Sequence, residues 1–461
     1  MEYRVYSARW VFMAITSIHV FCVIFMMYCY AGINTVITAY FQTTPFFIDL
    51  LATWAIFMSA VSLPVLALFK DNSSLRNQIL STIACIIIGS IFGAIGFSNR
   101  KWFYVVLGSQ TFFGISSAIN LVIQISLPAN WFPAHESATV VGVFWASCSL
   151  GQAAAAGILP FIIGSLDATE PESTFLKVKL VFLIVNGGIA FLHLLTGILS
   201  WFYLADHPPS PPSASQQYIL KQKTNQKSPN TEMLISNIKP IAKVHRNREY
   251  SLLTLAHLLA FSVVILTKIL VTSVFLETFS SITDDDVAGI RLIGLLASVP
   301  ASIAVGKIID KTKNFKELTL TAHICLTVAC AGIVAGHRFK NFVCLAVLYP
   351  VAMILQMFSN VTLIEFMIET TYPMDKIVLV TSHYFVAEMG LFLLSSGIRY
   401  TLQNYGVLAA VSTVLVICAI SVLVLFSVRP NYNRLNTDMD KGDCRDKMID
   451  ETRILLREGQ N

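Results

Sequence analysis

The feature that most constrains the fold of this chain is a series of apolar runs, each as long as a helix that crosses a lipid bilayer. Such a helix needs roughly 20 predominantly apolar residues. Because hydrophobic residues make up 55% and charged residues only 13% of the 461 residues, a water-soluble multidomain protein is excluded. We therefore predict an all-α integral membrane protein. Its twelve apolar runs lie near 10–41, 46–69, 78–97, 102–130, 137–165, 176–204, 249–280, 286–309, 318–336, 341–371, 376–402 and 405–428.

A polar stretch near the middle of the chain separates the runs into two groups of six. Residues 206–248 are rich in proline, serine, glutamine and lysine and have too little apolar surface to offset the entropy of ordering. We interpret this stretch as a flexible linker. The predicted organisation is a cytoplasmic N-terminus (1–9), an N-terminal six-helix half (10–204), a cytoplasmic linker (205–248), a C-terminal six-helix half (249–428) and a cytoplasmic tail (429–461).

The distribution of Lys and Arg predicts the orientation in the membrane. The segments expected to be cytoplasmic contain 23 of these residues and the opposite loops contain 7, with Arg291 counted among the latter. Cytoplasmic loops of membrane proteins carry an excess of Lys and Arg. Both termini and the linker are therefore predicted to face the cytosol. Because the basic residues are placed between spans, the net charge of +5 does not indicate nucleic acid as a partner.

Cysteine and histidine positions argue against a bound metal. Eight of the nine Cys lie in apolar segments, and the sequence has no CxxC pair. His19, His193 and His257 are isolated from other potential ligands. The sequence also pairs no nucleophile with a base, so we expect neither an enzyme nor a cofactor or metal.

Two short turns between spans combine an acidic residue with cations. An acidic side chain in such a turn can cap a helix or pair across a hairpin, and so hold one access state of a transporter. Major facilitator transporters carry a similar loop, of the form GxxxD[RK], in each half, which favours a gate. The alternative is a solvated turn that only sets topology. The turns are Gly306-Lys-Ile-Ile-Asp310-Lys311-Thr-Lys313 after the eighth span and, as a fainter copy, Lys70-Asp71 with Arg76 after the second.

Three further motifs carry a more specific resemblance. They are Tyr6-Ser-Ala-Arg-Trp10-Val-Phe, Asn130-Trp-Phe-Pro-Ala-His-Glu-Ser-Ala-Thr139 and Glu365-x-x-x-Glu369-x-x-Tyr372-Pro373. Together they resemble the feline leukaemia virus subgroup C receptor-related family, solute carrier family 49, of major facilitator transporters. Within it, the sequence is most similar to the branch called major facilitator superfamily domain-containing protein seven. The resemblance covers residues 6–435.

This resemblance implies a major facilitator fold with twelve transmembrane helices in two six-helix halves. It implies a facilitator of small solutes, because choline, ethanolamine and haem transport are attached to different members. Choline-type members hold the quaternary amine against a Trp in span one and a Tyr in span seven. Met27 and Leu270 occupy those positions here, and Ser117 and Glu388 replace family glutamines. The two aromatic residues that hold the quaternary amine, here called the choline cage, are thus missing. The identity of the substrate therefore stays open.

Span eleven has the most informative polar residues. Thr381, Tyr384, Glu388, Ser395 and Arg399 share one helical face by their spacing, so this face is expected to line a cavity. A charge inside a membrane is costly and therefore marks a functional candidate. We predict that Glu388 acts on the substrate or on a coupled proton, whereas Arg399 pairs with a neighbouring span.

The other candidates follow from helical spacing, from the turn motifs and from positions at which the family resemblance implies a substrate contact, as at Leu270. Lys268 and Glu277 of span seven are nine residues apart and so lie on opposite faces of a straight helix. We expect Glu277 to face the cavity with Leu270, and Lys268 to form a structural pair or snorkel. The candidate substrate-binding residues are Met27, Tyr30, Asn34, Ser117, Trp145, Leu270, Glu277, Tyr384 and Glu388. The candidate gating residues are Asp71, Arg76, Gly306, Asp310, Lys311, Glu365 and Glu369.

Secondary transport of a small organic solute is the predicted function, and choline, ethanolamine and haem are its candidate substrates. The alternative is a non-transporting receptor or scaffold, which the short outer loops disfavour. The expected partners are a small-molecule substrate and the lipid bilayer, with sorting adaptors at the tail. Tyr432-Asn-Arg-Leu435 and Glu451-Thr-Arg-Ile-Leu455-Leu456 have the form of sorting signals. They favour the plasma membrane or an endolysosomal membrane.

Overall fold

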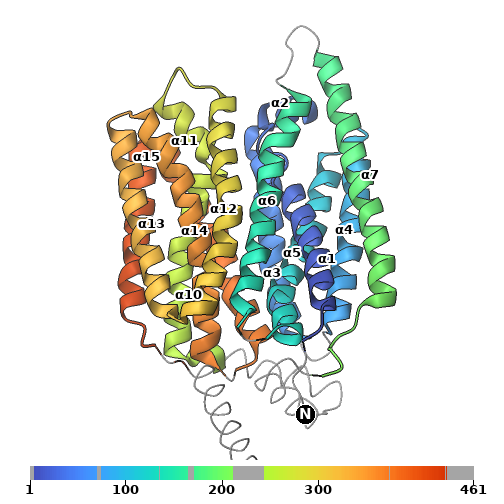
Figure 1. Cartoon of the computed structure of the whole chain (residues 1–461). Coiled ribbons are helices and arrows are strands. Elements are labelled where there is room, and N and C mark those ends of the chain that lie inside the picture. Colours follow the sequence, from blue (N-terminus) through green and yellow to red (C-terminus); the bar gives the residue numbers. More distant parts are fainter. Residues whose placement is uncertain are drawn as a thin grey trace, which may run out of the picture.

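The computed structural model describes residues 5–69, 74–133, 135–164, 171–210, 243–372, 374–430 and 432, and these residues are almost entirely helical. Two helical halves stand side by side (Figure 1). The N-terminal half comprises α1 (Ala8–Tyr28), α2 (Asn34–Phe41), α3 (Pro45–Leu68), α4 (Leu75–Phe97), α5 (Phe103–Trp131), α6 (Ser137–Ile163) and α7 (Pro171–Tyr203). The C-terminal half comprises α10 (Arg248–Phe261), the π-helix η2 (Ile265–Ile269), α11 (Val271–Thr278), α12 (Asp284–Thr312), α13 (Phe315–Arg338), α14 (Phe342–Thr371) and α15 (Lys376–Phe426).

The start points of several helices are fixed by side-chain caps. A polar side chain that accepts a hydrogen bond from a first-turn amide satisfies a donor that has no partner within the helix. At α12 the cap is reciprocal, because Thr283 and Asp286 bond each other's backbone amides. The other described caps of this kind are Ser74, Asn247, Asn341 and Asp375, which precede α4, α10, α14 and α15.

The prediction of an α-helical membrane protein with twelve spans is confirmed in its architecture, although not every span is one helix. Among the described residues, 11 helical segments are long and apolar enough to cross a membrane. One of them, α15, is 51 residues long and breaks at Gly406, where φ is 81°. Because φ is positive there, glycine fits better than other residues, and the two parts of α15 correspond to spans eleven and twelve.

The first span of each half is interrupted, which the sequence did not predict. Span one consists of α1 and α2, separated by residues 29–33. Span seven consists of α10, η2 and α11 in succession. The matching interruptions agree with two repeats of the same topology, and in transporters such discontinuous helices adjoin the binding site.

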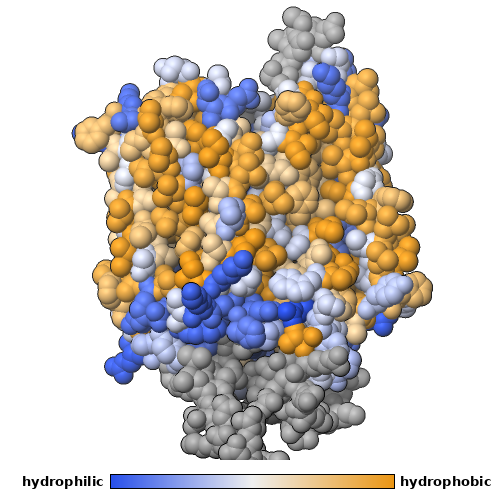
Figure 2. All heavy atoms as spheres, in the orientation of Figure 1, coloured by the Kyte–Doolittle hydropathy of each residue, from blue (hydrophilic) through white to orange (hydrophobic). Residues whose placement is uncertain are grey.

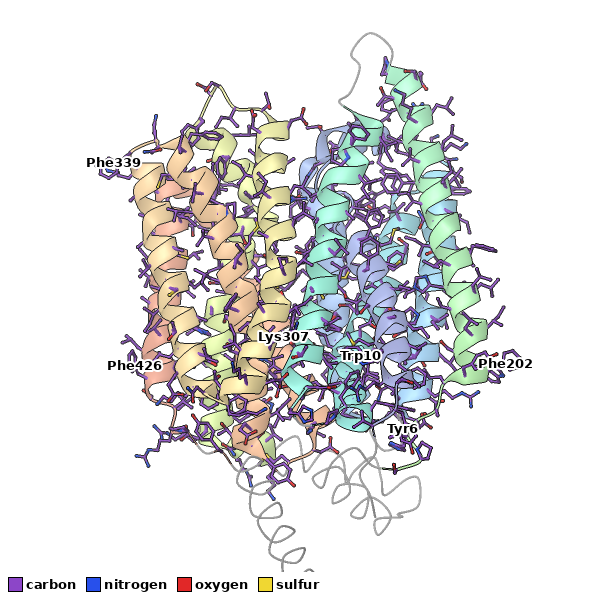
Figure 3. The ribbon with its side chains drawn as sticks, in the orientation of Figure 1. Tyr6, Trp10, Phe202, Lys307, Phe339 and Phe426 are labelled. Atoms are coloured by element: carbon purple, nitrogen blue, oxygen red, sulfur yellow. The ribbon has the colours of Figure 1, made fainter. Side chains whose placement is uncertain are left out.

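The outer surface fits a lipid environment. On the face shown in Figure 2, a broad apolar belt lies between two more polar ends. Within it, Phe202 and Phe426 point outward near one end and Phe339 near the other (Figure 3), with exposed fractions of 75%, 57% and 79%. Large exposed apolar side chains in this number are stable only when lipid covers them. The chain is therefore a multi-pass membrane protein.

The described ends of the chain lie on one face of the bundle. The Tyr6 hydroxyl and the Ser210 hydroxyl lie 3.2 Å apart, and the backbone amide of Arg429 donates to Glu249 at 2.7 Å. The N-terminus, both ends of the linker and the start of the tail thus lie on the same side, as expected from an even number of spans in each half. Below, this side is called the terminal face. The sorting motifs beyond Tyr432 lie outside the described residues.

The two halves meet closely along α6 and α12. A Cβ atom at Gly142 of α6 would lie 2.4 Å from the carbonyl oxygen of Ser302, and one at Gly306 of α12 would lie 2.4 Å from that of Ala138. Such distances are far inside van der Waals contact, so only glycine allows the two backbones to approach this closely. Helices α3 and α15 also meet across this boundary, where the rings of Phe57 and Phe392 lie 5.2 Å apart.

The structure corrects the position of one counted cation. Arg291 belongs to α12 and is 7% exposed, so it is not part of an outer loop. The predicted apolar run 286–309 already contains Arg291, so the charge count was wrong to include this residue in a loop. Without Arg291, the sequence count is 23 Lys and Arg in the segments predicted to be cytoplasmic against 6 in the opposite loops.

Candidate functional site

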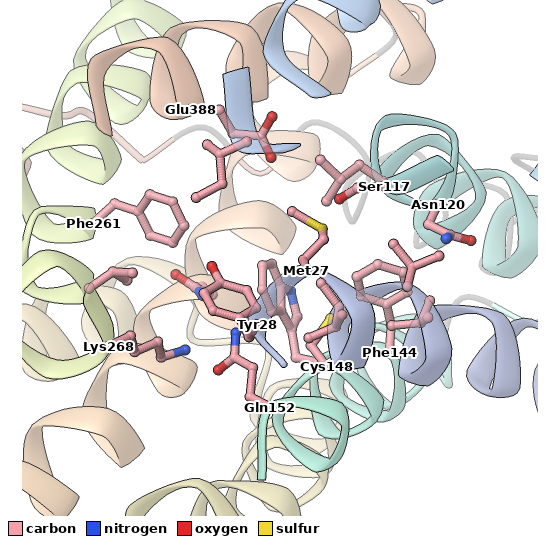
Figure 4. Close-up of a pocket in the computed structure, with 18 of the residues that line it drawn as sticks. Met27, Tyr28, Ser117, Asn120, Phe144, Cys148, Gln152, Phe261, Lys268 and Glu388 are labelled. Carbon is pink, nitrogen blue, oxygen red and sulfur yellow. The ribbon is translucent and has the colours of Figure 1, made fainter. Parts of the chain in front are cut away.

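A cavity lies between the halves at the level of the interrupted spans. Together with the open space at its mouth, it measures about 710 Å³. Residues of α1, α3, α5 and α6 line it from one half, and residues of α10, η2, α14 and α15 line it from the other. The wall is mainly apolar, with a few polar side chains that converge on it (Figure 4). This combination is typical of a site for a small organic ligand.

Four predicted substrate-binding residues line this cavity. They are Met27 of α1, Ser117 of α5, Trp145 of α6 and Glu388 of α15. Since they come from both halves, movement of one half against the other changes the shape of the site.

The other five predicted substrate-binding residues lie outside the cavity lining. Tyr30 is packed within its own half, where its hydroxyl accepts a hydrogen bond from Gln110 at 3.3 Å and its ring stacks on Phe182. Tyr384 packs against the rings of His257 and His383. Leu270 is buried at the junction of η2 and α11. The remaining two are Asn34 and Glu277, which are described below.

The expectation that Glu277 rather than Lys268 faces the cavity is wrong. Lys268 lines the cavity and is 6% exposed, whereas Glu277 is exposed at the end of α11. The reason is η2, because a π-helical turn holds more residues than an α-helical turn and shifts the phase of everything after it. Spacing arguments for a straight helix therefore fail across residues 265–269.

Glu388 and Lys268 project into the cavity from different sides (Figure 4). Oε2 of Glu388 is buried and accepts no hydrogen bond within the described part of the chain. The Ser59 hydroxyl lies nearby, outside hydrogen-bonding geometry. Among the described residues, Lys268 forms no ion pair with any carboxylate. Two opposite charges thus face one cavity without neutralising each other.

Several cavity residues were missed by the sequence analysis. Tyr28, Asn120, Cys148 and Asn360 all line the cavity. Tyr28 follows Met27 directly, and the choice of one helical face in span one excluded it. The other three are small or neutral polar residues within long apolar spans, where the sequence carries no signal that separates cavity lining from helix contacts.

At the terminal face, the N-terminus of α6 is held by acidic residues of the other half. The Asp310 carboxylate accepts hydrogen bonds from the backbone amides of Ala138 and Thr139 at 3.1 and 2.7 Å, and from the Thr139 hydroxyl at 2.6 Å. Glu365 accepts a hydrogen bond from the Ser137 hydroxyl at 3.1 Å. A carboxylate at a helix N-terminus also interacts favourably with the helix dipole. These contacts close this face between the halves.

The other predicted gating residues lie near this closure or outside the description. Gly306 forms the close contact with Ala138, and Glu369 is buried one turn after Glu365. Lys311 is exposed, and it is Lys313 whose ammonium lies 3.8 Å from Asp310. Arg76 donates to the Trp201 carbonyl and, through its amide, to Asp206, so it ties α4 to the end of α7 within one half. Asp71 lies outside the described residues.

A second closure lies at the opposite end of the bundle. Arg399 of α15 pairs with Asp49 of α3 at 2.6 Å, across the boundary between the halves. Asn34 donates to the same carboxylate at 3.0 Å. The prediction that Arg399 pairs with a neighbouring span is confirmed, and Asn34 belongs to this closure. The two halves are thus in contact at both ends of the bundle, and the cavity lies between these contacts.

The fold and the cavity between its halves are those of a membrane transporter, and comparisons with known proteins agree. The Major Facilitator Superfamily model matches residues 16–395, so the chain belongs to this superfamily. The crystal structure of a single-residue variant of the E. coli fucose:proton symporter FucP has the same fold, with a TM-score of 0.67 at 9% identity, over 92% of this chain and all of that one. A second FucP structure, described as outward in conformation, gives a TM-score of 0.66 at 9% identity, over 90% of this chain and 99% of that one.

Two similar sequences are choline/ethanolamine transporters. The human choline/ethanolamine transporter FLVCR2 is 23% identical over 375 residues, which span 80% of this chain and 67% of that protein. The rat protein of the same name is 22% identical over 373 residues, spanning 80% of this chain and 65% of its own length. The resemblance to the feline leukaemia virus subgroup C receptor-related family is thereby supported.

Proposed function

We propose that this protein transports a small amine-bearing organic solute through the cavity between its halves. The observation that carries this proposal is the carboxylate of Glu388, which faces the cavity and lacks a hydrogen-bond partner at Oε2 among the described residues. A carboxylate in a desolvated site needs a cation or a proton. The names of the relatives, which refer to choline and ethanolamine, support an amine as that cation.

Aromatic side chains support the same assignment, although they are not the family's cage residues. Met27 and Leu270 stand at the cage positions. Tyr28, Trp145 and Phe261 line the cavity instead. An aromatic face attracts an ammonium group, so these three rings and Glu388 offer an alternative amine site.

Uptake into proteoliposomes tests the proposal. Labelled choline, ethanolamine and haem are offered with and without a proton gradient, and Glu388→Gln is compared with Glu317→Gln, a change at an exposed residue of α13. We expect uptake of an amine, reduced about tenfold or more by Glu388→Gln and unaffected by the control. Loss of pH dependence with exchange intact would instead assign Glu388 to a coupled proton. Protein that moves none of these solutes would favour the receptor or scaffold.

We further propose that the chain belongs to the branch called major facilitator superfamily domain-containing protein seven. We also propose that the terminal face is cytoplasmic. The excess of Lys and Arg at this face supports the orientation. A glycan on Asn72, in the sequon Asn72-Ser-Ser between spans two and three, would overturn this orientation.

For the location in the cell, we propose that sorting adaptors bind the two motifs in the C-terminal tail. Replacing Leu455 and Leu456 by Ala tests this. If the protein were then distributed between plasma membrane and endolysosomes as before, the motif would have no sorting role.

A further inference from the structure

The charges around the cavity include more cations than the binding of an amine explains. Lys268 lines the cavity, and Arg291 of α12 lies close enough to Lys268 to interact with it electrostatically. Both side chains are buried, at 6% and 7% exposure. Like charges in a low-dielectric region repel each other, and each carries a cost of desolvation. A site that evolved for a simple organic cation gains nothing from two such residues.

The position of Lys268 is fixed by its helix. It belongs to η2, which the Leu270 amide closes by donating to the Ile265 carbonyl at 2.7 Å, and the neighbouring Thr267 hydroxyl donates to the Val263 carbonyl at 3.0 Å. Figure 4 shows the lysine amine directed into the cavity, toward the region of Tyr28 and Gln152. π-Helical turns are frequent at functional sites. Here the π-helical turn contains the cation that lines the cavity.

No carboxylate in the described part of the chain forms an ion pair with Lys268. The acidic residue that lines the cavity, Glu388, forms no ion pair with it. Arg291 likewise has no carboxylate partner within the described residues. A buried cation without an anion is costly, and a ligand that brings an anion removes this cost. A ligand that also brings an ammonium satisfies Glu388 at the same time.

We propose that the transported solute is a zwitterion, whose anionic group pairs with Lys268 and whose ammonium group faces Glu388. This inference rests on the proposed transport of an amine and narrows its substrate class. Choline and ethanolamine carry only the cationic group, which Lys268 and Arg291 repel. Glycine betaine and glycine have the same ammonium groups, with a carboxylate in place of the hydroxymethyl group, and so carry both charges.

Exchange of these four labelled solutes by purified protein in liposomes tests the inference. We expect glycine betaine or glycine to exchange about tenfold faster than choline or ethanolamine, respectively. Lys268→Met, which keeps much of the side-chain length without the charge, is expected to abolish this preference. Lys177→Met is the matched control, because Lys177 is exposed on α7, and it should leave the preference unchanged.

A second measurement on the unchanged protein covers the case in which Lys268→Met does not fold. Glycine betaine at millimolar concentration should raise the thermal unfolding temperature, and choline should raise it less. Exchange of choline or ethanolamine in preference to both zwitterions, or an unchanged preference in folded Lys268→Met, would overturn the inference and leave amine transport standing. Exchange of none of the four solutes would overturn both.

Discussion

Glu388 is a residue whose removal should harm function more than stability. Its carboxylate has no ion-pair partner among the described residues, so changing it to the neutral amide in Glu388→Gln removes a desolvation cost and breaks no ion pair. We expect folded protein with an unfolding temperature in detergent equal to or above that of the unchanged chain. Thermal unfolding followed by tryptophan fluorescence measures this.

A Glu388→Gln variant that does not fold would indicate a structural role for Glu388. If Glu388→Gln reached the membrane as folded protein only when combined with Lys268→Met, the two residues would be a structural pair. The amine site would then lose its main support. Glu317→Gln serves as the control for expression, because Glu317 is exposed and remote from the cavity.

At the scale of elements, the contact between α6 and α12 offers a test with a matched pair of glycines. Gly142→Ala places a methyl group 2.4 Å from the Ser302 carbonyl oxygen, so the helices must separate. Overpacking of this kind costs about 1–3 kcal/mol. We expect a lower unfolding temperature and slower transport.

Gly187→Ala is the control for this change. It lies in α7, where an added Cβ meets nothing within 4 Å. Because alanine favours a helix more than glycine does, this variant should be as stable as the unchanged protein or more so. Equal effects of the two changes on stability and transport would show that the close contact at Gly142 is unimportant.

The elements also show what the sequence can predict. The spans and the two halves follow from hydropathy, because a bilayer requires long apolar helices. The interruptions in spans one and seven do not, since residues 29–33 and 265–269 lie inside the predicted runs 10–41 and 249–280 and contain no proline. Spacing arguments placed Met27, Trp145 and Glu388 at the cavity correctly, but Tyr30 and Tyr384 lie outside its lining although they share the predicted faces of Met27 and Glu388. They also failed for Lys268 and Glu277, because η2 changes the helical phase in span seven. Contacts between the halves, such as Asp49 with Arg399, join residues 350 positions apart and leave no local pattern.

For the whole molecule, the closures at the two ends should oppose each other. Asp310 holds the terminal face through α6, and the pair of Asp49 with Arg399 holds the opposite end. Asp310→Asn leaves one oxygen to accept hydrogen bonds where two accepted before, and so should favour opening at the terminal face. Arg399→Gln removes the ion pair and should favour opening at the other end. Distances between spin labels placed on the two halves at each end report these shifts.

The two changes should shift the equilibrium between the forms open at either end in opposite directions. Each shift should be about 1 kcal/mol or more, because each change removes a partly buried contact. Lys311→Gln is the control at the terminal face, because Lys311 is exposed. If Asp310→Asn and Arg399→Gln opened the same end, the closures would not be alternatives in one transport cycle.

Protection of a native thiol tests the central claim, that solute binds in the cavity between the halves, most directly. Cys148 lines the cavity and Cys325 is exposed on α13, so one molecule contains both the probe and its reference. In protein that keeps only these two cysteines, we predict that glycine betaine slows alkylation of Cys148 by a membrane-permeant maleimide. We predict no effect on Cys325 and no protection in the Glu388→Gln variant. Alkylation of Cys148 at the same rate with and without every amine that the protein transports would contradict the account.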